Sequence, residues 1–201
     1  MLATGHREDR VKLALANSGL EVHFCYNQAY ERTQNAVSLA LCRRALGDTA
    51  FFKLDGDVFF EPEVLQRLDS SPGSLAVAVD SSRQADAEAM KVRTSAKGGI
   101  VAFGKALSSA ESAGETLGIE RISQGACPKL FDALDAAVRA GLDDLYYEDV
   151  YSTLIGAGSL DALAVEVGDL GWAEIDDFSD LERAERLAAG IAAPPVPFLS
   201  H

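Results

Sequence analysis

An apolar run at residues 50–54 ends directly in the acidic triplet Asp55-Gly56-Asp57. This triplet constrains the fold more than any other feature, because open α/β sheets bind their ligands beyond the carboxyl ends of their strands. Hard divalent cations such as Mg²⁺ or Mn²⁺ take carboxylate oxygens there and complete their coordination with water and substrate phosphates. The triplet therefore predicts a metal site for nucleotide chemistry. The alternative is a polar turn that simply follows a buried strand.

A second acidic cluster lies near the end of the chain, at residues 172–177. Strand alternation puts Glu174 and Asp176 on one face of a short strand and Ile175 on the other. Asp177 has an explanation of its own, because the Asp-Phe-Ser-Asp sequence that it begins is typical of a capped helix start. Glu174 and Asp176 therefore remain as candidate site residues.

Composition favours one globular domain at residues 1–189, since 201 residues with 48% hydrophobic and 24% charged side chains are ordinary for such a domain. Residues 190–201, with three prolines, are expected to form a loosely packed tail. A formal net charge of −13 argues against binding to nucleic acid or to an anionic membrane surface. An acidic protein that handles phosphates usually needs a metal ion between them.

Two further features predict a cytoplasmic protein. No apolar stretch of about 18 residues and no basic leader followed by an apolar run occurs, so neither a membrane span nor a secretory signal is expected. The three cysteines are widely spaced and form no CxxC motif, which favours reduced thiols over disulfides or a zinc site. They are Cys25, Cys42 and Cys127.

The first half of the chain alternates between helix and strand patterns. Helices are predicted at residues 7–17, 35–46 and 61–68, and strands at residues 21–26, 50–54 and 75–79. This alternation is typical of an α/β fold with a mainly parallel sheet flanked by helices.

From residue 90 onward the periodicity changes. Short strands are predicted at residues 90–93, 100–103 and 117–122, which indicates a small antiparallel insertion. Such a section often forms the acceptor side of a site. After it come helices at residues 127–140 and 148–155, a strand at residues 163–167 and a closing helix at residues 177–188.

Several short segments, in this order, resemble the sugar-phosphate and choline-phosphate nucleotidyltransferases, which have a Rossmann-like fold. The resemblance is strongest to the branch that contains phosphocholine and inositol-1-phosphate cytidylyltransferases. No single segment is decisive, but together they reach from Thr4 to Leu181. The matches are residues 4–7, Asn27 with Tyr30, Thr33 and Asn35, residues 54–58, residues 90–92, Gly104-Lys105, residues 146–149 and residues 172–176.

The resemblance implies that Asp57 is a catalytic metal ligand and that Glu174 and Asp176 complete a site for Mg²⁺ or Mn²⁺. It implies transfer of a nucleotidyl group, with CTP the favoured donor, to a small phosphorylated alcohol or sugar phosphate. A phosphate oxygen of the acceptor would attack the α-phosphorus, and pyrophosphate would leave. Positioning and charge neutralisation suffice for such a transfer, so no protein nucleophile is needed.

The same resemblance implies contacts to both substrates. Thr33 and Asn35 would touch the ribose or the base, although helix capping is an alternative for both. Lys91, as a catalytic residue, and Lys105 would contact phosphate or acceptor groups, while surface lysines are the alternative.

An aromatic and acidic segment follows at residues 146–149. By the resemblance, Tyr147 and Glu148 would line the acceptor pocket together with Tyr146 and Asp149. Aromatic packing beside a helix N-terminus explains this segment nearly as well.

One departure from the family concerns the start of the chain. The family begins with a strand, a glycine-rich phosphate loop and a helix, and the opening residues 1–5 resemble the end of its second strand. A chain lacking that first unit is expected to bind a nucleoside triphosphate poorly and to expose an apolar sheet edge that could form a homo-oligomer. A truncated, non-catalytic remnant and a metal-dependent glycosyltransferase using the Asp-x-Asp motif remain the alternatives.

Overall fold

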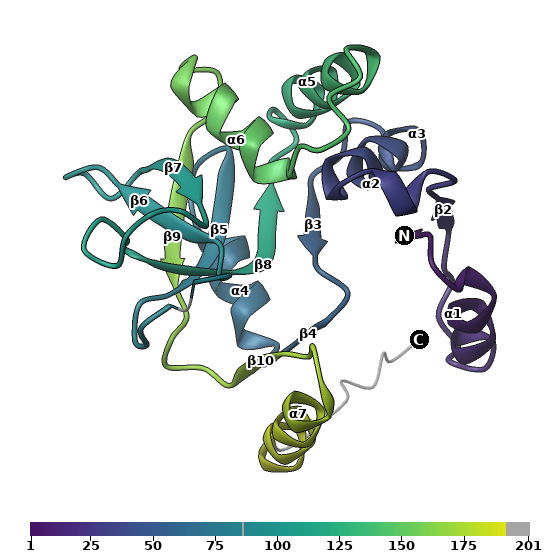
Figure 1. Cartoon of the computed structure of the whole chain (residues 1–201). Helices are drawn as coiled ribbons and strands as arrows, with labels where there is room; N and C mark the ends of the chain where they lie inside the picture. Colours follow the sequence, from purple (N-terminus) through teal and green to yellow (C-terminus); the bar gives the residue numbers. More distant parts are fainter. Residues whose placement is uncertain (86, 192–201) are drawn as a thin grey trace, which may run out of the picture.

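The structure, a computed structural model, describes residues 1–85 and 87–191. Its centre is a six-stranded sheet in the order β7-β6-β8-β5-β9, with β3 paired to β8 on the side opposite β5 (Figure 1). The strands are β3 (Phe51–Leu54), β5 (Leu75–Asp80), β6 (Lys91–Thr94), β7 (Ile100–Gly104), β8 (Gly114–Ile122) and β9 (Ala162–Glu166). Helices flank this sheet, which confirms the predicted α/β fold class.

The direction of the strands corrects one part of the prediction. Within the six-stranded sheet only the β5–β9 pair is parallel, whereas β8 runs antiparallel to β3, β5 and β6. The reason is the length of β8, which was expected only at residues 117–122 and as part of an insertion. Its nine residues reach from the β6–β7 hairpin into the centre of the sheet, where they separate β3 from β5.

The sheet carries two hydrophobic layers because the side chains of β5 alternate between its faces. Leu75, Val77 and Val79 face one layer, while Ala76 and Ala78 face the other. The first layer is covered by α2 (Asn35–Leu41), α5 (Cys127–Arg139) and α6 (Tyr147–Gly156). The second is covered by α4 (Glu63–Ser70). Both faces of β5 are therefore buried, as expected for a central strand.

Two small sheets complete the fold. β1 (Leu2–Thr4) pairs in parallel with β2 (Phe24–Tyr26), and β4 (Val58–Phe60) pairs antiparallel with β10 (Trp172–Glu174). Figure 1 shows the first of these beside α1 (Glu8–Leu15), at the opposite side of the molecule from β6, β7 and β9. The second leads into α7 (Phe178–Gly190), which lies below the sheet in that view.

The predicted elements are confirmed with small shifts at their ends. The helix expected at residues 35–46 is two helices, because the chain turns at Cys42 between α2 and α3 (Arg43–Leu46). Residues 30–32 form one 3₁₀ turn, and residues 58–60 form the strand β4. Residues 192–201, most of the predicted tail, lie outside the described residues.

The cysteine thiols, the helices and the exposed apolar residues of β3 bear on three further predictions. Cys25, Cys42 and Cys127 are free thiols. No helix among residues 1–85 and 87–191 combines the length and the apolar character that a membrane crossing requires. Phe52 and Leu54 of β3 are exposed beside a cavity of about 300 Å³, which β1, α2 and β3 line. An apolar edge is therefore present, and the oligomeric state stays a prediction.

Candidate functional site

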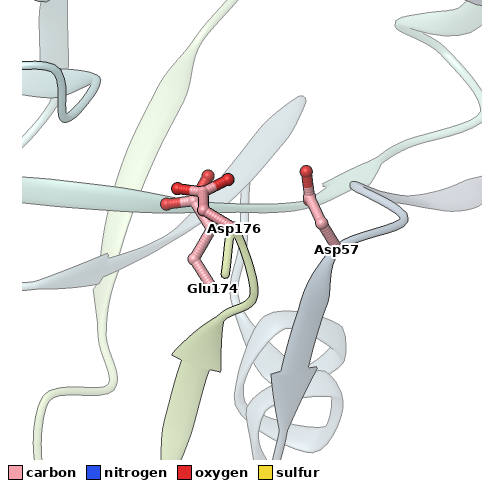
Figure 2. A group of neighbouring side chains, drawn as sticks. All are labelled: Asp57, Glu174 and Asp176. Atoms are coloured by element: carbon pink, nitrogen blue, oxygen red, sulfur yellow. The ribbon is translucent and has the colours of Figure 1, made fainter. Parts of the chain in front are cut away.

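Three carboxylates meet where β4 and β10 pair: Glu174 ends β10, Asp57 directly precedes β4 and Asp176 follows β10. Register places Glu174 opposite Val58, and the amide of Ile175 then donates a 2.8 Å hydrogen bond to the carbonyl oxygen of Asp57. One carboxylate oxygen each of Asp57, Glu174 and Asp176 lies within 4.8 Å of the other two. Figure 2 shows the three side chains extending toward the same side of the strands. We call this group the acidic triad.

The acidic triad fits a hard divalent cation. Its ligand atoms are carboxylate oxygens, and all three residues are exposed, so a bound ion could keep water and substrate oxygens in its remaining positions. Partial burial, followed by the nearby charges of Asp55 and Asp176, raises the pKa of Asp57. A cation would relieve this repulsion. Asp177 is not part of the group, because its Oδ1 accepts hydrogen bonds from the amides of Ser179 and Asp180 and caps α7 as predicted.

Glu174 and Asp176 also line a cavity of about 570 Å³ between β8, β10 and the start of α6. The same cavity is lined by three further kinds of side chain. The aromatic ones are Tyr146, Tyr147 and Trp172, the basic ones are Arg83, Lys105 and Arg183, and the other acids are Asp55, Glu88, Glu115, Glu148 and Asp180. A polar cavity with both charges and flat rings suits a small charged ligand better than an apolar one.

Trp172 fixes β10, the strand that carries the acidic triad's Glu174. Its indole Nε1 donates a 2.8 Å hydrogen bond to Oδ2 of Asp80, a carboxylate at the end of β5 that is fully buried. The guanidinium of Arg83 pairs with the same oxygen at 2.9 Å and lies over the indole ring. Asp80 was not predicted as a site residue. The signal that could have indicated it is an acid directly after the apolar strand at residues 75–79, as for Asp55.

A second charge cluster, which the sequence did not predict, lies under the cavity with Lys53, Glu120 and Glu148 buried and Asp55 partly exposed. The Nζ of Lys53 lies 3.0 Å from Oδ1 of Asp55 and 3.0 Å from Oε2 of Glu120. Lys53 and Glu120 face each other because they are partners in the β3–β8 register. The contact to Glu120 is an ion pair without hydrogen-bond alignment, so both oxygens of this fully buried carboxylate lack a hydrogen-bond partner. With Glu148, these residues form what we call the buried charge cluster.

Tyr147 joins this cluster to the helices. Its hydroxyl donates a 2.8 Å hydrogen bond to Oδ2 of Asp55, and its ring lies 3.6 Å from the Lys53 ammonium. Its backbone amide donates to Oδ1 of Asn35 at 2.9 Å. Gly118 leaves room for the Asp55 carboxylate, since a Cβ atom on this glycine would lie 2.1 Å from Oδ2 and its φ is +67°. Asp55 is therefore held inward, away from the acidic triad.

Burial dominates the electrostatics of the cluster. It raises the pKa of Glu120 to about 8 and that of Glu148 to about 7, although the charge of Lys53 acts in the opposite direction on both. Burial alone would lower the pKa of Lys53, but the carboxylates of Glu120, Asp55 and Glu148 together raise it. The lysine therefore stays charged, while the two glutamates hold protons more tightly than usual.

The predicted nucleotide contacts, Thr33 and Asn35, lie just before and at the start of α2. The hydroxyl of Thr33 accepts a hydrogen bond from Nδ2 of Asn27 and donates one to the carbonyl of Ala29. Asn35 bonds to Tyr147, as described above, and lines the cavity. Neither side chain caps α2, whose N-cap residue is Gln34 without a side-chain bond, although Asn35 accepts the hydrogen bond of the first amide of α6. Contact with ribose or base stays a prediction.

The two predicted lysines lie close together but differ in exposure. Lys91 is buried, and its Nζ donates to the carbonyls of Ala87, Ala89 and Lys105, the last at 2.8 Å. The side chain of Lys105 lines the cavity, lies over the ring of Tyr146 and pairs with Glu88 at 3.7 Å. Lys91 thus anchors the backbone from which Lys105 extends.

Residues 146–149 were interpreted either as part of an acceptor pocket or as packing beside a helix N-terminus, and the structure has features of both. Oδ2 of Asp149 accepts a 2.9 Å hydrogen bond from the amide of Tyr146 and so caps α6, as the alternative reading expected. Tyr146, Tyr147 and Glu148 line the cavity. Their predicted contact with an acceptor remains to be tested.

Comparison with known proteins gives one curated relative. The CMP-5'-(3-aminopropyl)phosphonate synthase of Streptomyces rubellomurinus (strain ATCC 31215) is 28% identical over 196 residues, which cover 92% of this chain. The chain spans only about 30% of the length of that relative. No protein-family profile matches the sequence.

Solved structures share the fold. The inositol-1-phosphate CTP transferase of T. maritima superimposes with a TM-score of 0.75 at 21% identity, covering 94% of this chain and 76% of the other. The CTP:phosphocholine cytidylyltransferase of Streptococcus pneumoniae gives a TM-score of 0.68 at 18% identity, covering 90% and 74%. At these identities the likeness is one of fold, and it confirms the fold that the short segments implied.

Proposed function

Because this chain has the nucleotidyltransferase fold and carries three crowded carboxylates beside its cavity, we propose that it transfers a nucleotidyl group in a metal-dependent reaction. The donor would be a nucleoside triphosphate, with CTP favoured, and the acceptor a small molecule with a phosphate or phosphonate group. The acidic triad of Asp57, Glu174 and Asp176 is the observation that carries this proposal. The names of the relative and of the two structures, which all concern cytidine nucleotides, support the choice of CTP.

In this reaction Asp57, Glu174 and Asp176 would hold Mg²⁺ or Mn²⁺. The ion would neutralise charge on the phosphates and help to align the acceptor oxygen with the α-phosphorus. Lys105 reaches the same cavity and would place a second positive charge near the phosphates. Lys91 would act through Lys105, since its ammonium holds the Lys105 carbonyl at 2.8 Å.

The remaining residues would select and position the substrates. Thr33 and Asn35 precede or begin α2 and would contact the ribose or base. Tyr147 and Glu148 would form the acceptor side of the cavity. The Tyr147 amide donates a hydrogen bond to Asn35, so this bond would link the nucleotide side of the cavity to its acceptor side.

The test is release of pyrophosphate from CTP, in Mg²⁺ and with phosphocholine, inositol 1-phosphate or 3-aminopropylphosphonate as acceptor. ATP, GTP and UTP serve as comparison donors. Asp57→Asn should reduce turnover at least about a hundredfold, as loss of a charged transition-state contact does. Asp69→Asn, an exposed acid of α4, is the matched control. Absence of pyrophosphate release with every acceptor, or full activity of Asp57→Asn, would contradict the proposal.

The glycosyltransferase alternative requires both acids of the Asp-x-Asp motif at one metal. Here Asp55 is tied inward to Lys53 and Tyr147, and only Asp57 joins Glu174 and Asp176. This geometry favours nucleotidyl transfer. The remnant alternative predicts that CTP binds without turnover, and the same assay tests it.

A further inference from the structure

We propose that the part of the cavity around Glu148 binds a protonated amine that bears N–H groups, so that the acceptor is an aminoalkyl phosphate or phosphonate. This inference rests on the proposed function, because it specifies the acceptor of the same reaction. It names Glu148 as the residue that selects the acceptor, at a different part of the cavity from the acidic triad.

The first observation is the missing partner of Glu148. This residue is only 4% exposed, lines the cavity, and its buried Oε2 has no hydrogen-bond partner. A buried carboxylate oxygen without a donor is unfavourable, because it has lost its water and gained nothing in exchange. A ligand that brings an N–H donor into the cavity would supply the missing bond.

The second observation is the charge balance beneath the cavity. Asp55, Glu120 and Glu148 surround Lys53, which is the one cation that residues 1–85 and 87–191 contribute to this cluster. Burial raises the pKa of Glu120 to about 8 and that of Glu148 to about 7, so near neutral pH both glutamates are only partly ionised beside the ammonium group of Lys53. The other groups facing Glu148 are the phenols of Tyr147 and Tyr151, which add no positive charge. A ligand cation beside Glu148 would favour the ionised form of this carboxylate.

The surroundings favour an organic ammonium over a metal ion. Mg²⁺ needs near-octahedral coordination by oxygens and keeps several waters, whereas Glu148 is buried beside the rings of Tyr146 and Tyr147. The rings of Tyr147 and Tyr146 already lie beside the ammonium groups of Lys53 and Lys105, which shows that these surroundings accept an organic cation. An N–H group is also required, since a trimethylammonium group could not donate a hydrogen bond to Oε2.

The same cavity can hold both ends of such an acceptor. Glu174 and Asp176 line it together with Glu148. A phosphate or phosphonate at the metal of the acidic triad and an amine at Glu148 would therefore orient the acceptor from two points. Two-point binding of this kind positions the attacking oxygen.

The experiment compares three ligands of similar size: 3-aminopropylphosphonate, its N,N,N-trimethyl analogue and butylphosphonate. Binding is measured by titration calorimetry and turnover by pyrophosphate release from CTP. Wild-type protein should prefer 3-aminopropylphosphonate over both others by about 10–100-fold in affinity and in kcat/KM, as expected for a charge-assisted hydrogen bond. Glu148→Gln should lose this preference. Asp144→Asn, which removes an exposed acid just before α6, should retain it.

Three results would overturn the inference. These are equal binding of the three ligands by wild-type protein, a preference that Glu148→Gln retains, and a loss of Mg²⁺ affinity in Glu148→Gln, which would make this residue a metal ligand. Each of them can occur while wild-type protein still releases pyrophosphate, so the proposed function would stand. Failure to bind or use any of the three ligands or the other acceptors would instead contradict both proposals.

Discussion

The acidic triad and the buried charge cluster are neighbours in the chain but opposites in environment. Asp57 and Asp55 are two residues apart on one strand end, yet Asp57 joins two other exposed acids while Asp55 is held inward by Lys53 and Tyr147. Exposed acids that crowd together without a cation are suited to an external ion. The fully buried Glu120 beside Lys53 must be balanced from within, because water cannot reach it.

Because of this difference, substitutions in the acidic triad should affect function, and substitutions in the buried charge cluster should affect stability. Replacing an acid of the triad removes repulsion and should leave the fold intact. Replacing Lys53, the cation of the buried charge cluster, should disturb the packing of β3, β8 and α6 at once. Substitutions that test stability, pH dependence and metal binding can therefore show whether the two groups are as independent as the geometry indicates.

The largest effect is expected for Lys53→Met. At pH 8, where Glu120 is ionised in part, it leaves Asp55 and the fully buried Glu120 without their cation, and breaking such a buried pair typically lowers the free energy of unfolding by about 3–5 kcal/mol. Urea unfolding measures this loss. Lys12→Met, which removes the more exposed partner of the Lys12–Glu8 pair, should change it by less than about 1 kcal/mol. A loss in Lys53→Met as small as the control's would show that the cluster is not stabilised by its lysine.

A double variant tests whether Lys53 and Glu120 stabilise the fold as a pair. Glu120→Gln, added to Lys53→Met, removes one of the stranded charges and should restore part of the lost stability. Because the two residues are direct partners, their effects should not be additive. Simple addition of the two single losses would mean that Lys53 and Glu120 contribute separately.

The pH dependence of stability should come from the buried cluster. The pKa of Glu120 is about 8 and that of Glu148 about 7 in the folded protein, against an ordinary value of 4.5. Between pH 4.5 and about pH 8 the folded state binds more protons than the unfolded state. The contribution of Glu120 and Glu148 to stability is therefore greatest below about pH 4.5 and is lost as pH rises toward 8. Unfolding free energy should therefore fall between pH 5 and pH 8.

Glu120→Gln is the variant that checks this origin. It should flatten the fall between pH 5 and pH 8, because the neutral amide cannot titrate. Asp69→Asn lies outside the cluster and should leave the slope as it is. An unchanged slope in Glu120→Gln would assign the pH dependence to other groups.

The smallest effects on stability are expected in the acidic triad. Asp57→Asn, Glu174→Gln and Asp176→Asn should change the unfolding free energy by no more than about 0.5 kcal/mol, as exposed substitutions usually do. Each should weaken Mg²⁺ or Mn²⁺ binding by at least about tenfold, since a neutral amide replaces an anionic ligand. Calorimetry on the double variants should show non-additive losses, as expected for ligands of one ion. Full additivity would mean that the three residues act at separate places.

Each member of the acidic triad has a local signal in the sequence, and the resemblance to nucleotidyltransferases implied that the three belong to one metal site. Asp57 follows an apolar strand, and Glu174 and Asp176 share a strand face. The buried cluster has no such signal, although a lysine inside the apolar run at residues 50–54 is unusual. Lys53 and Glu120 become partners only through the antiparallel β3–β8 register, which depends on the unpredicted path of β8.

The fold shows the same division between local and long-range information. Helix and strand positions follow from periodicity and were predicted closely. Strand direction does not, because a nine-residue strand can enter the sheet from either end. Asp80 and its bond to Trp172 likewise join residues 92 positions apart, and only the tertiary structure brings them together.

The central claim is that the acidic triad, and not the buried cluster, holds the divalent cation. Mn²⁺ titration followed by electron paramagnetic resonance tests it directly on wild-type protein, Asp57→Asn and Glu148→Gln. The account predicts one Mn²⁺ site in the wild type, an affinity at least about tenfold lower in Asp57→Asn and an unchanged affinity in Glu148→Gln. Wild-type affinity in Asp57→Asn, or a loss confined to Glu148→Gln, would contradict it.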